Sequence, residues 1–272
     1  MSGGGHPGSL RPRPLRRADP RNHPDRGHPA CYDRASGRFR QGEVIVSALK
    51  QALIIGASRG LGRAMAEALA AGGTSVVATV RDASRTPFAG TQGIRTLPLD
   101  VNDPQGGEQL VGALAGARFD LVLVNAGIKG PDHQDAGKAG AAEIADLFLT
   151  NAISPIRLAR GLLPLVRRGG VLAFMSSRMG SVALNDTGSS ELYRASKAAL
   201  NSLGRSFAVR DALPVGVGVL MLHPGWVQTD MGGASAPLTI PESVSGMTRV
   251  LEASLDDPAH RFLDYQGETL AW

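Results

Sequence analysis

A tyrosine and a lysine four residues apart are the first candidates for chemistry in this sequence. Tyr193 and Lys197 lie in the segment ELYRASKAAL, whose small side chains favour a helix. Residues i and i+4 share one face of a helix, so the phenol and the ammonium group are expected to lie close together. A neighbouring positive charge favours the phenolate, and we expect it to lower the tyrosine pKa from about 10 toward the range useful for proton transfer. The pair alone does not exclude an ordinary amphipathic helix with one exposed lysine.

A glycine-rich turn is the second candidate site. The segment GASRGLG follows an apolar run and places Gly56, Gly60 and Gly62 at the start of an expected helix. Glycines permit a tight turn, and the free N–H groups at a helix N-terminus bind phosphate. The spacing is G-x-x-x-G-x-G rather than GxGxxG, but the strand, turn and helix around it predict dinucleotide binding.

These residues belong to a series of short motifs in one order along the chain. The series consists of the three glycines, Asp100-Val101, Asn125–Gly127 (NAG), Asn151, Ser176-Ser177, Tyr193–Lys197 (YRASK) and His223–Met231 (HPGWVQTDM). In this order the chain resembles the short-chain dehydrogenase/reductase family over residues 51–272. Within that family it is similar to the carbonyl-reductase-like branch that includes C-factor and sniffer proteins.

The resemblance implies four catalytic residues. Tyr193 would exchange a proton with the substrate oxygen, and Lys197 would lower the tyrosine pKa and hold the nicotinamide ribose. Ser177 would bind the substrate oxygen and stabilise the charge that develops there. Asn151 would support a water molecule that links Lys197 to solvent.

The serine assignment departs from the commoner family spacing. Ser177 lies 16 residues before Tyr193, whereas a shorter distance is usual in the family, and Ser181 lies at that shorter distance. We assign Ser177 because it directly follows the apolar strand GGVLAFMS and because this branch has a longer loop here. Ile55, where the family usually has threonine, is expected to cost the glycine turn one hydrogen bond.

Two arginines indicate the cofactor. An enzyme that uses NAD normally ends its second strand in an acidic residue, but this sequence has Val80 there, followed by Arg81. Arg81 and Arg59 are expected to bind a ribose 2′-phosphate, which favours NADP(H) over NAD(H). By resemblance, and with no metal ligand assigned, the other cofactor-binding residues are Ser58, Leu61, Asp100, Val101, Asn125, Ala126, Gly127, Pro224, Gly225, Val227 and Thr229.

Four residues of the last motif are interpreted separately. His223 is interpreted as a strand-end residue with its hydrogen bonds satisfied rather than as a proton shuttle. Thr229 is expected to donate its hydroxyl to the nicotinamide carboxamide. Trp226 and Met231 either shape the substrate pocket or pack in the core, and the sequence does not separate these two roles.

The alternation of β-branched runs with Ala/Leu-rich stretches predicts the elements that must position these residues. It is typical of a parallel sheet with helices on both faces, so we expect a single α/β domain at 46–272, doubly wound and Rossmann-like. Strands are expected near 51–56, 74–80, 94–100, 119–127, 169–177, 215–225 and 261–265. Helices are expected near 60–71, 104–115, 141–166, 191–211 and 241–254.

The first 45 residues differ in composition from the rest. They are rich in Pro, Gly, Arg and His without apolar periodicity, which predicts a disordered basic tail. Arg16 and Arg17 resemble an export signal, but no apolar segment follows them. Residues 1–50 hold 10 basic and 4 acidic residues, whereas residues 51–272 hold 19 and 20, so the expected domain is not basic. A gene start near Val46 would make the tail an artefact of start-site choice, and this alternative stays open.

Composition also limits the location and the partners. The single cysteine, Cys31, excludes an intramolecular disulfide, and no apolar run is long enough to span a bilayer, so we expect a cytoplasmic protein without membrane association. No nucleic-acid partner is expected. The small residues Ala195, Ala198 and Ala199, together with the helix around 142–165, are expected to form the face of a homodimer or homotetramer.

The sequence therefore predicts an NADP(H)-dependent oxidoreductase that interconverts a small-molecule carbonyl compound and a primary or secondary alcohol. One alternative is a signalling protein of C-factor type that binds the dinucleotide with little turnover. Another is a protein that binds nucleic acid through the basic tail.

Overall fold

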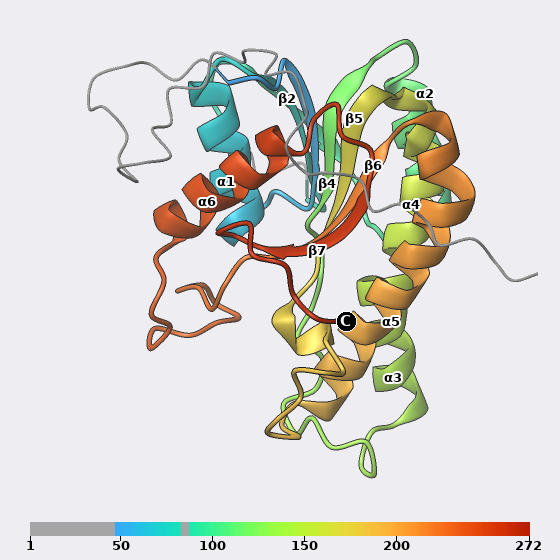
Figure 1. The fold of residues 1–272 in the computed structure, drawn as a ribbon, viewed down its shortest axis with the longest axis vertical. Coiled ribbons are helices and arrows are strands. Elements are labelled where there is room, and N and C mark those ends of the chain that lie inside the picture. Colours follow the sequence, from blue (N-terminus) through green and yellow to red (C-terminus); the bar gives the residue numbers. More distant parts are fainter. Residues whose placement is uncertain (1–46, 83–86) are drawn as a thin grey trace, which may run out of the picture. The chain divides into compact units, whose positions relative to one another are not determined.

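The computed structural model describes residues 47–82 and 87–272 (Figure 1). The tail expected at 1–45, with Cys31 and the Arg16-Arg17 pair, lies outside the described residues. Within the part that is described, no helix is both long and apolar enough to cross a membrane.

A seven-stranded parallel sheet forms the centre of the domain, as predicted (Figure 1). Its strand order is β3-β2-β1-β4-β5-β6-β7, so the direction in which strands are added reverses between β1 and β4. Ligands bind at this reversal in doubly wound sheets, outside the carboxyl ends of the strands. The strands are β1 (Gln51–Ile55), β2 (Ser75–Val80), β3 (Ile94–Pro98), β4 (Phe119–Val124), β5 (Val166–Met175), β6 (Gly218–His223) and β7 (His260–Asp264).

Helices cover both faces of the sheet (Figure 1). Strand side chains alternate between two apolar cores: Leu53 and Ile55 face α2, α4 and α5, whereas Ala52 and Ile54 face α1 and α6. Because helices cover both faces, the central strands β1, β4 and β6 are mostly apolar, which is why they could be predicted from the sequence, whereas the edge strands β3 and β7 are more polar. The helices are α1 (Gly60–Ala71), α2 (Pro104–Ala113), α3 (Ala141–Phe148), α4 (Ser154–Leu162), α5 (Glu191–Phe207) and α6 (Ile240–Ala253).

The prediction of one continuous helix over 141–166 is wrong, and one of its interruptions affects the site. A turn of π-helix, Leu149–Ile153, separates α3 from α4, and a 3₁₀ turn, Leu163–Leu165, follows α4. Pro155 carries no N–H group, so the main-chain carbonyl of Asn151 cannot accept the hydrogen bond that an α-helix would supply from residue i+4. Proline therefore accounts for the interruption, and Asn151 lies in the π-turn.

Candidate active site

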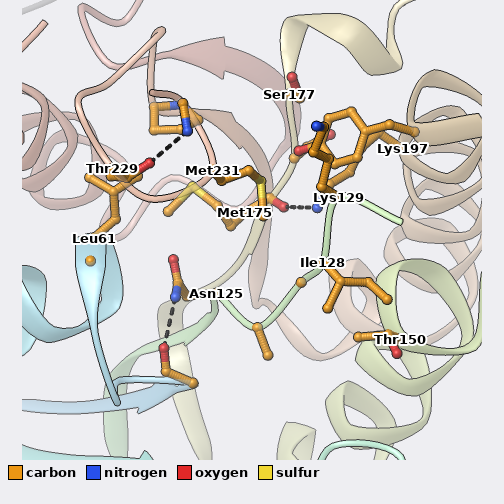
Figure 2. Close-up of a pocket in the computed structure, with 18 of the residues that line it drawn as sticks. Leu61, Asn125, Ile128, Lys129, Thr150, Met175, Ser177, Lys197, Thr229 and Met231 are labelled. Atoms are coloured by element: carbon orange, nitrogen blue, oxygen red, sulfur yellow. Dashed lines mark hydrogen bonds between the residues drawn. The ribbon is translucent and has the colours of Figure 1, made fainter. Parts of the chain in front are cut away.

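A pocket of about 940 Å³ lies at the carboxyl ends of the strands, where β1 and β4 adjoin. It is lined by Ser177, Tyr193 and Lys197 and by nearly all of the predicted cofactor residues. In Figure 2, Leu61, Asn125 and Thr229 lie along one side of the pocket, and Ser177 and Lys197 lie on the other. Two predicted residues, Gly62 and Asn151, are buried and do not line it.

The glycine turn is held in a shape that only glycine permits. Gly56 has φ +83°, and a Cβ atom on Gly62 would lie 2.2 Å from the carbonyl oxygen of Gly56. The Asn125 side chain donates a hydrogen bond to that same oxygen at 2.8 Å (Figure 2). The Gly56 N–H donates to Thr79 Oγ1 at 3.0 Å, so a neighbouring strand supplies a side-chain hydrogen bond to the turn despite Ile55.

The start of α1 fits a dinucleotide diphosphate. No side chain caps this N-terminus, and its first turn contains no acidic residue. Gly60, the first residue of α1, has open space around it, since an added Cβ would meet only Thr229, at 4.0 Å. Free N–H groups at such an end attract a phosphate through hydrogen bonds and through the helix dipole.

The two arginines predicted to select the cofactor differ in their surroundings. Arg81 follows the last residue of β2, is exposed and lines the pocket. Arg59 lies in the glycine turn and forms an exposed ion pair with Asp230, in the segment after β6. The ion pair thus links the glycine turn to the segment after β6, and both of its residues line the pocket.

Ser177 and Tyr193 are brought together, whereas Ser181 is not. Ser177 lies close enough to Tyr193 to favour its phenolate, and Ser177 Oγ accepts from the Met179 N–H at 3.1 Å. Ser181 is buried, does not line the pocket, and accepts from the Leu184 N–H at 3.0 Å. The geometry therefore favours Ser177 as the serine that reaches a substrate.

Burial changes the acidity of the tyrosine and the lysine in opposite directions. Lys197 is 3% exposed and donates a hydrogen bond from Nζ to the Met175 carbonyl oxygen at 2.8 Å (Figure 2). Burial lowers the pKa of Lys197 to about 8. Tyr193 is partly accessible from the pocket and otherwise enclosed by protein. Burial raises its pKa to about 12, while the nearby Ser177 side chain acts the other way.

The expectation that Lys197 lowers the tyrosine pKa is therefore wrong for this structure. The ammonium group lies 5.8 Å from the centroid of the Tyr193 ring and is directed to a main-chain carbonyl. Removal of the phenol from water disfavours the phenolate more than its neighbours favour it. At neutral pH the phenol is protonated and the lysine is mostly cationic.

Asn151 is fully buried, and its side chain is fully engaged. Its Oδ1 accepts from the Ile128 N–H at 2.8 Å, and its Nδ2 donates to the Ile128 carbonyl at 2.8 Å and to Ser196 Oγ at 3.0 Å. The residue thereby fixes the segment after β4 to α5. The main-chain carbonyl that Pro155 leaves without its α-helical partner is a second acceptor of Asn151, beside Oδ1, for a bound water.

Gln134 is a site residue that sequence reasoning missed. It has φ +53° and is 8% exposed, and its side-chain oxygen accepts from the Tyr193 N–H at 2.9 Å. Its amide also donates to the carbonyls of Lys129 and Pro131. Gln134 thus holds the first turn of α5 against the 128–135 segment, a contact that no local motif signals.

The expectation that His223 has its hydrogen bonds satisfied is also wrong. Its Nδ1 is buried and has no hydrogen-bond partner within the described residues. Burial lowers its pKa to about 4, with Asp264 raising it and Arg178 lowering it, so the imidazole is neutral at pH 7. Trp226 and Met231 line the pocket and are 57% and 47% exposed, which supports a role in shaping it.

Thr229 Oγ1 accepts from the Gly232 N–H at 3.0 Å (Figure 2). The carboxamide contact expected of this hydroxyl stays a prediction.

The doubly wound sheet, the glycine turn at the strand reversal and the Ser177–Tyr193–Lys197 group together define a nucleotide-binding fold with acid–base side chains beside the nucleotide site. Residues 50–237 match the short chain dehydrogenase family, and the chain belongs to this family, as the motifs predicted.

Three known proteins show which members of this family the chain is similar to. It is 43% identical over 155 residues to C-signal from Myxococcus xanthus, which covers 56% of this chain and 92% of that protein. A structure described as a short-chain dehydrogenase/reductase from Burkholderia multivorans with bound NADP is 42% identical, with a TM-score of 0.79, covering 82% of this chain and 100% of that one. The carbonyl reductase Sniffer of D. melanogaster is 29% identical, with a TM-score of 0.74, covering 82% and 100%. These similarities confirm the predicted resemblance to C-factor and sniffer proteins.

Proposed function

We propose that this protein is an NADP(H)-dependent oxidoreductase that interconverts a carbonyl compound and an alcohol, with Tyr193 as the acid and base. The observation that carries the proposal is that Ser177, Tyr193 and Lys197 line the same pocket as the glycine turn. Family membership and the NADP bound to the Burkholderia multivorans neighbour support the cofactor. The name of the Sniffer neighbour supports a carbonyl substrate.

When bound at the glycine turn of Gly56 and Gly60, NADP(H) would supply the hydride chemistry of the reaction. Ser177 binds the substrate oxygen and orients it toward Tyr193. In reduction the Tyr193 phenol donates its proton to that oxygen; because its pKa is raised to about 12, the phenol is fully protonated at neutral pH.

Lys197 stabilises the phenolate that proton donation creates. A phenolate in this enclosed position is costly without a nearby cation, and the Lys197 ammonium lies on the same face of α5. When bound, the nicotinamide ribose would compete with the Met175 carbonyl for the lysine N–H groups. The Asn151 main-chain carbonyl is the proposed support of the water that returns a proton to Lys197.

A purified-enzyme screen tests the proposal. NADPH oxidation is followed with aldehydes, ketones, quinones and keto esters, in the wild type and in Tyr193→Phe. We expect turnover with at least one carbonyl class and at least about a hundredfold lower kcat in the variant, with NADPH affinity little changed. Unchanged kcat in Tyr193→Phe would contradict the mechanism.

A second candidate is a signalling protein that binds the dinucleotide with little turnover. The similarity to C-signal favours it. The presence of all three side chains in the pocket favours the enzyme. The screen separates the two, because tight NADPH binding without turnover on any carbonyl class would support the signalling role.

A further inference from the structure

One cationic side chain next to the proposed reacting groups has no partner within the described part of the chain. Arg178 directly follows Ser177, so their Cα atoms lie about 3.8 Å apart. The Arg178 side chain is exposed and lines the pocket. Its guanidinium makes no hydrogen bond or ion pair within residues 47–82 and 87–272. A fixed charge beside a binding pocket is available to a ligand.

The main chain that carries Arg178 is held rigidly. It begins a 3₁₀ turn, Arg178–Gly180, that Ser177 caps by accepting from the Met179 N–H. The Asn201 side chain donates to the Gly180 carbonyl at 3.2 Å, and a Cβ atom on Gly180 would lie 2.9 Å from the carbonyl of Lys197. Close packing on α5 therefore fixes the base of the arginine side chain relative to the catalytic residues.

The other cations on this side of the pocket are already engaged. Arg194 donates to the Ser189 carbonyl at 2.7 Å, and Lys129 pairs with Asp132 at 3.2 Å. Among the acidic residues that line the pocket, Asp230 pairs with Arg59, and Asp146 lies beside Thr150. Asp100, which also lines the pocket, accepts from the Asn102 N–H at 2.9 Å. Among the described residues, none of these three carboxylates forms an ion pair with Arg178.

Apolar side chains also line the pocket on the segments that follow β5 and β6. Met179 and Leu184 come from the segment after β5, and Trp226 and Met231 come from the segment after β6. Burial lowers the pKa of His223, which follows β6 and lines the pocket; Asp264 raises it, and the positive charge of Arg178 lowers it. Apolar side chains beside an exposed cation that forms no ion pair within the described residues match a ligand that has an apolar body and one negative group.

We propose that the substrate is a carbonyl compound that carries a carboxylate, and that Arg178 binds this carboxylate while the carbonyl oxygen lies at Ser177 and Tyr193. The inference rests on the proposed function and adds the substrate class. Arginine binds carboxylates through two parallel N–H donors, which gives orientation as well as affinity. Arg178 would thereby orient the carbonyl group.

Matched acids and esters test the proposal. We would compare 4-oxopentanoate, 5-oxohexanoate and 4-acetylbenzoate with their methyl esters, with NADPH, in the wild type, Arg178→Gln and Arg178→Lys. Arg118→Gln is the control, because it removes the same charge from an exposed arginine that does not line the pocket. We expect the wild type to prefer an acid over its ester by roughly tenfold in kcat/KM, the low end for a charged hydrogen bond at an exposed site.

Arg178→Gln should lose that preference while keeping its activity on the esters, and Arg178→Lys should keep part of it. Arg118→Gln should behave as the wild type. Equal kcat/KM for acids and esters in the wild type, or equal losses for both in Arg178→Gln, would overturn the substrate class and leave the proposed function standing.

A binding measurement decides the proposal independently of turnover. Calorimetric titration of 4-acetylbenzoate and its methyl ester into the enzyme with saturating NADP⁺ should show tighter binding of the acid, lost in Arg178→Gln. If the acid binds no more tightly than the ester, the proposal fails, whether or not either compound is reduced. Tight acid binding without any reduction would instead count against the proposed function alone.

Discussion

The ammonium group of Lys197 donates a hydrogen bond to the Met175 carbonyl oxygen, 2.8 Å away, at the last residue of β5. This contact ties the middle of α5 to the strand that precedes Ser177. It is a single neutral partner for a buried cation, and burial lowers the pKa of Lys197 to about 8. A cation that is buried with so little compensation is ready to lose its proton near physiological pH.

The pH dependence of reduction should report this lysine. Lys197 is cationic below about pH 8 and becomes neutral as the pH rises, whereas Tyr193 stays protonated because its pKa is about 12. Without the nearby cation the phenolate is not stabilised, so kcat/KM for reduction should be level below about pH 7 and fall about tenfold per unit well above pH 8. A profile that stays level to pH 10 would show that the lysine charge is not needed.

Substitution of the two serines should separate their roles. Ser177→Ala removes the hydroxyl near Tyr193 that is proposed to bind the substrate oxygen, so kcat should fall by about 10²–10³. Ser181→Ala is the matched control, since its hydroxyl accepts only from the Leu184 N–H among the described contacts. It should keep kcat and lose about 1 kcal/mol of the free energy of unfolding. The reverse pattern of kcat values would reassign the serine.

Cofactor selection should depend on Arg81. Arg81→Ala should weaken NADPH binding by roughly tenfold, near the lower limit for a charged hydrogen bond because the side chain is exposed, and leave NADH binding nearly unchanged. Arg63→Ala is the control, since Arg63 is exposed on α1, pairs with Glu67 and does not line the pocket. Fluorescence titration with both cofactors measures this. Equal losses for NADPH and NADH would assign Arg81 a structural role.

Features that depend on neighbouring residues in the sequence could be predicted, whereas features that depend on contacts between distant segments could not. Apolar strands and the glycine turn are local patterns, so the doubly wound fold and the candidate nucleotide site could be predicted from them. The interruption at Leu149–Ile153 was missed because a periodic pattern continues through it, although Pro155 gives its physical cause. Burial of Tyr193 and the Gln134 contact depend on segments far apart in the chain, so neither the tyrosine pKa nor the support of α5 could be read from spacing.

Trp272 should support the segment that carries part of the pocket wall. Its ring stacks on His260 with centroids 4.8 Å apart, and its carbonyl accepts from the Ala183 N–H at 3.1 Å. Trp272→Ala should therefore cost about 1 kcal/mol of the free energy of unfolding and raise KM for the carbonyl substrate, with NADPH affinity unchanged. Trp272→Phe should keep most of the stability and a KM close to that of the wild type. An unchanged KM in Trp272→Ala would show that the stack does not influence the pocket.

The last prediction concerns where the stably folded domain begins. A protein that starts at Val46, translated as Met, should keep its Tm, its kcat/KM and its NADPH affinity, because residues 1–45 lack apolar periodicity. It should also elute earlier from a cation exchanger, since most of the excess positive charge is removed.

A second truncation, starting at Lys50, supplies the contrast. It removes the Ser47 hydroxyl that donates to Glu252 at 2.7 Å and the Leu49 side chain, which is 1% exposed. Burial of one leucine contributes about 1.5–3 kcal/mol, so this variant should lose roughly 5 °C or more in Tm. A comparable loss in the protein that starts at Val46 would contradict the predicted boundary, because it would mean that residues before Val46 contribute to the core.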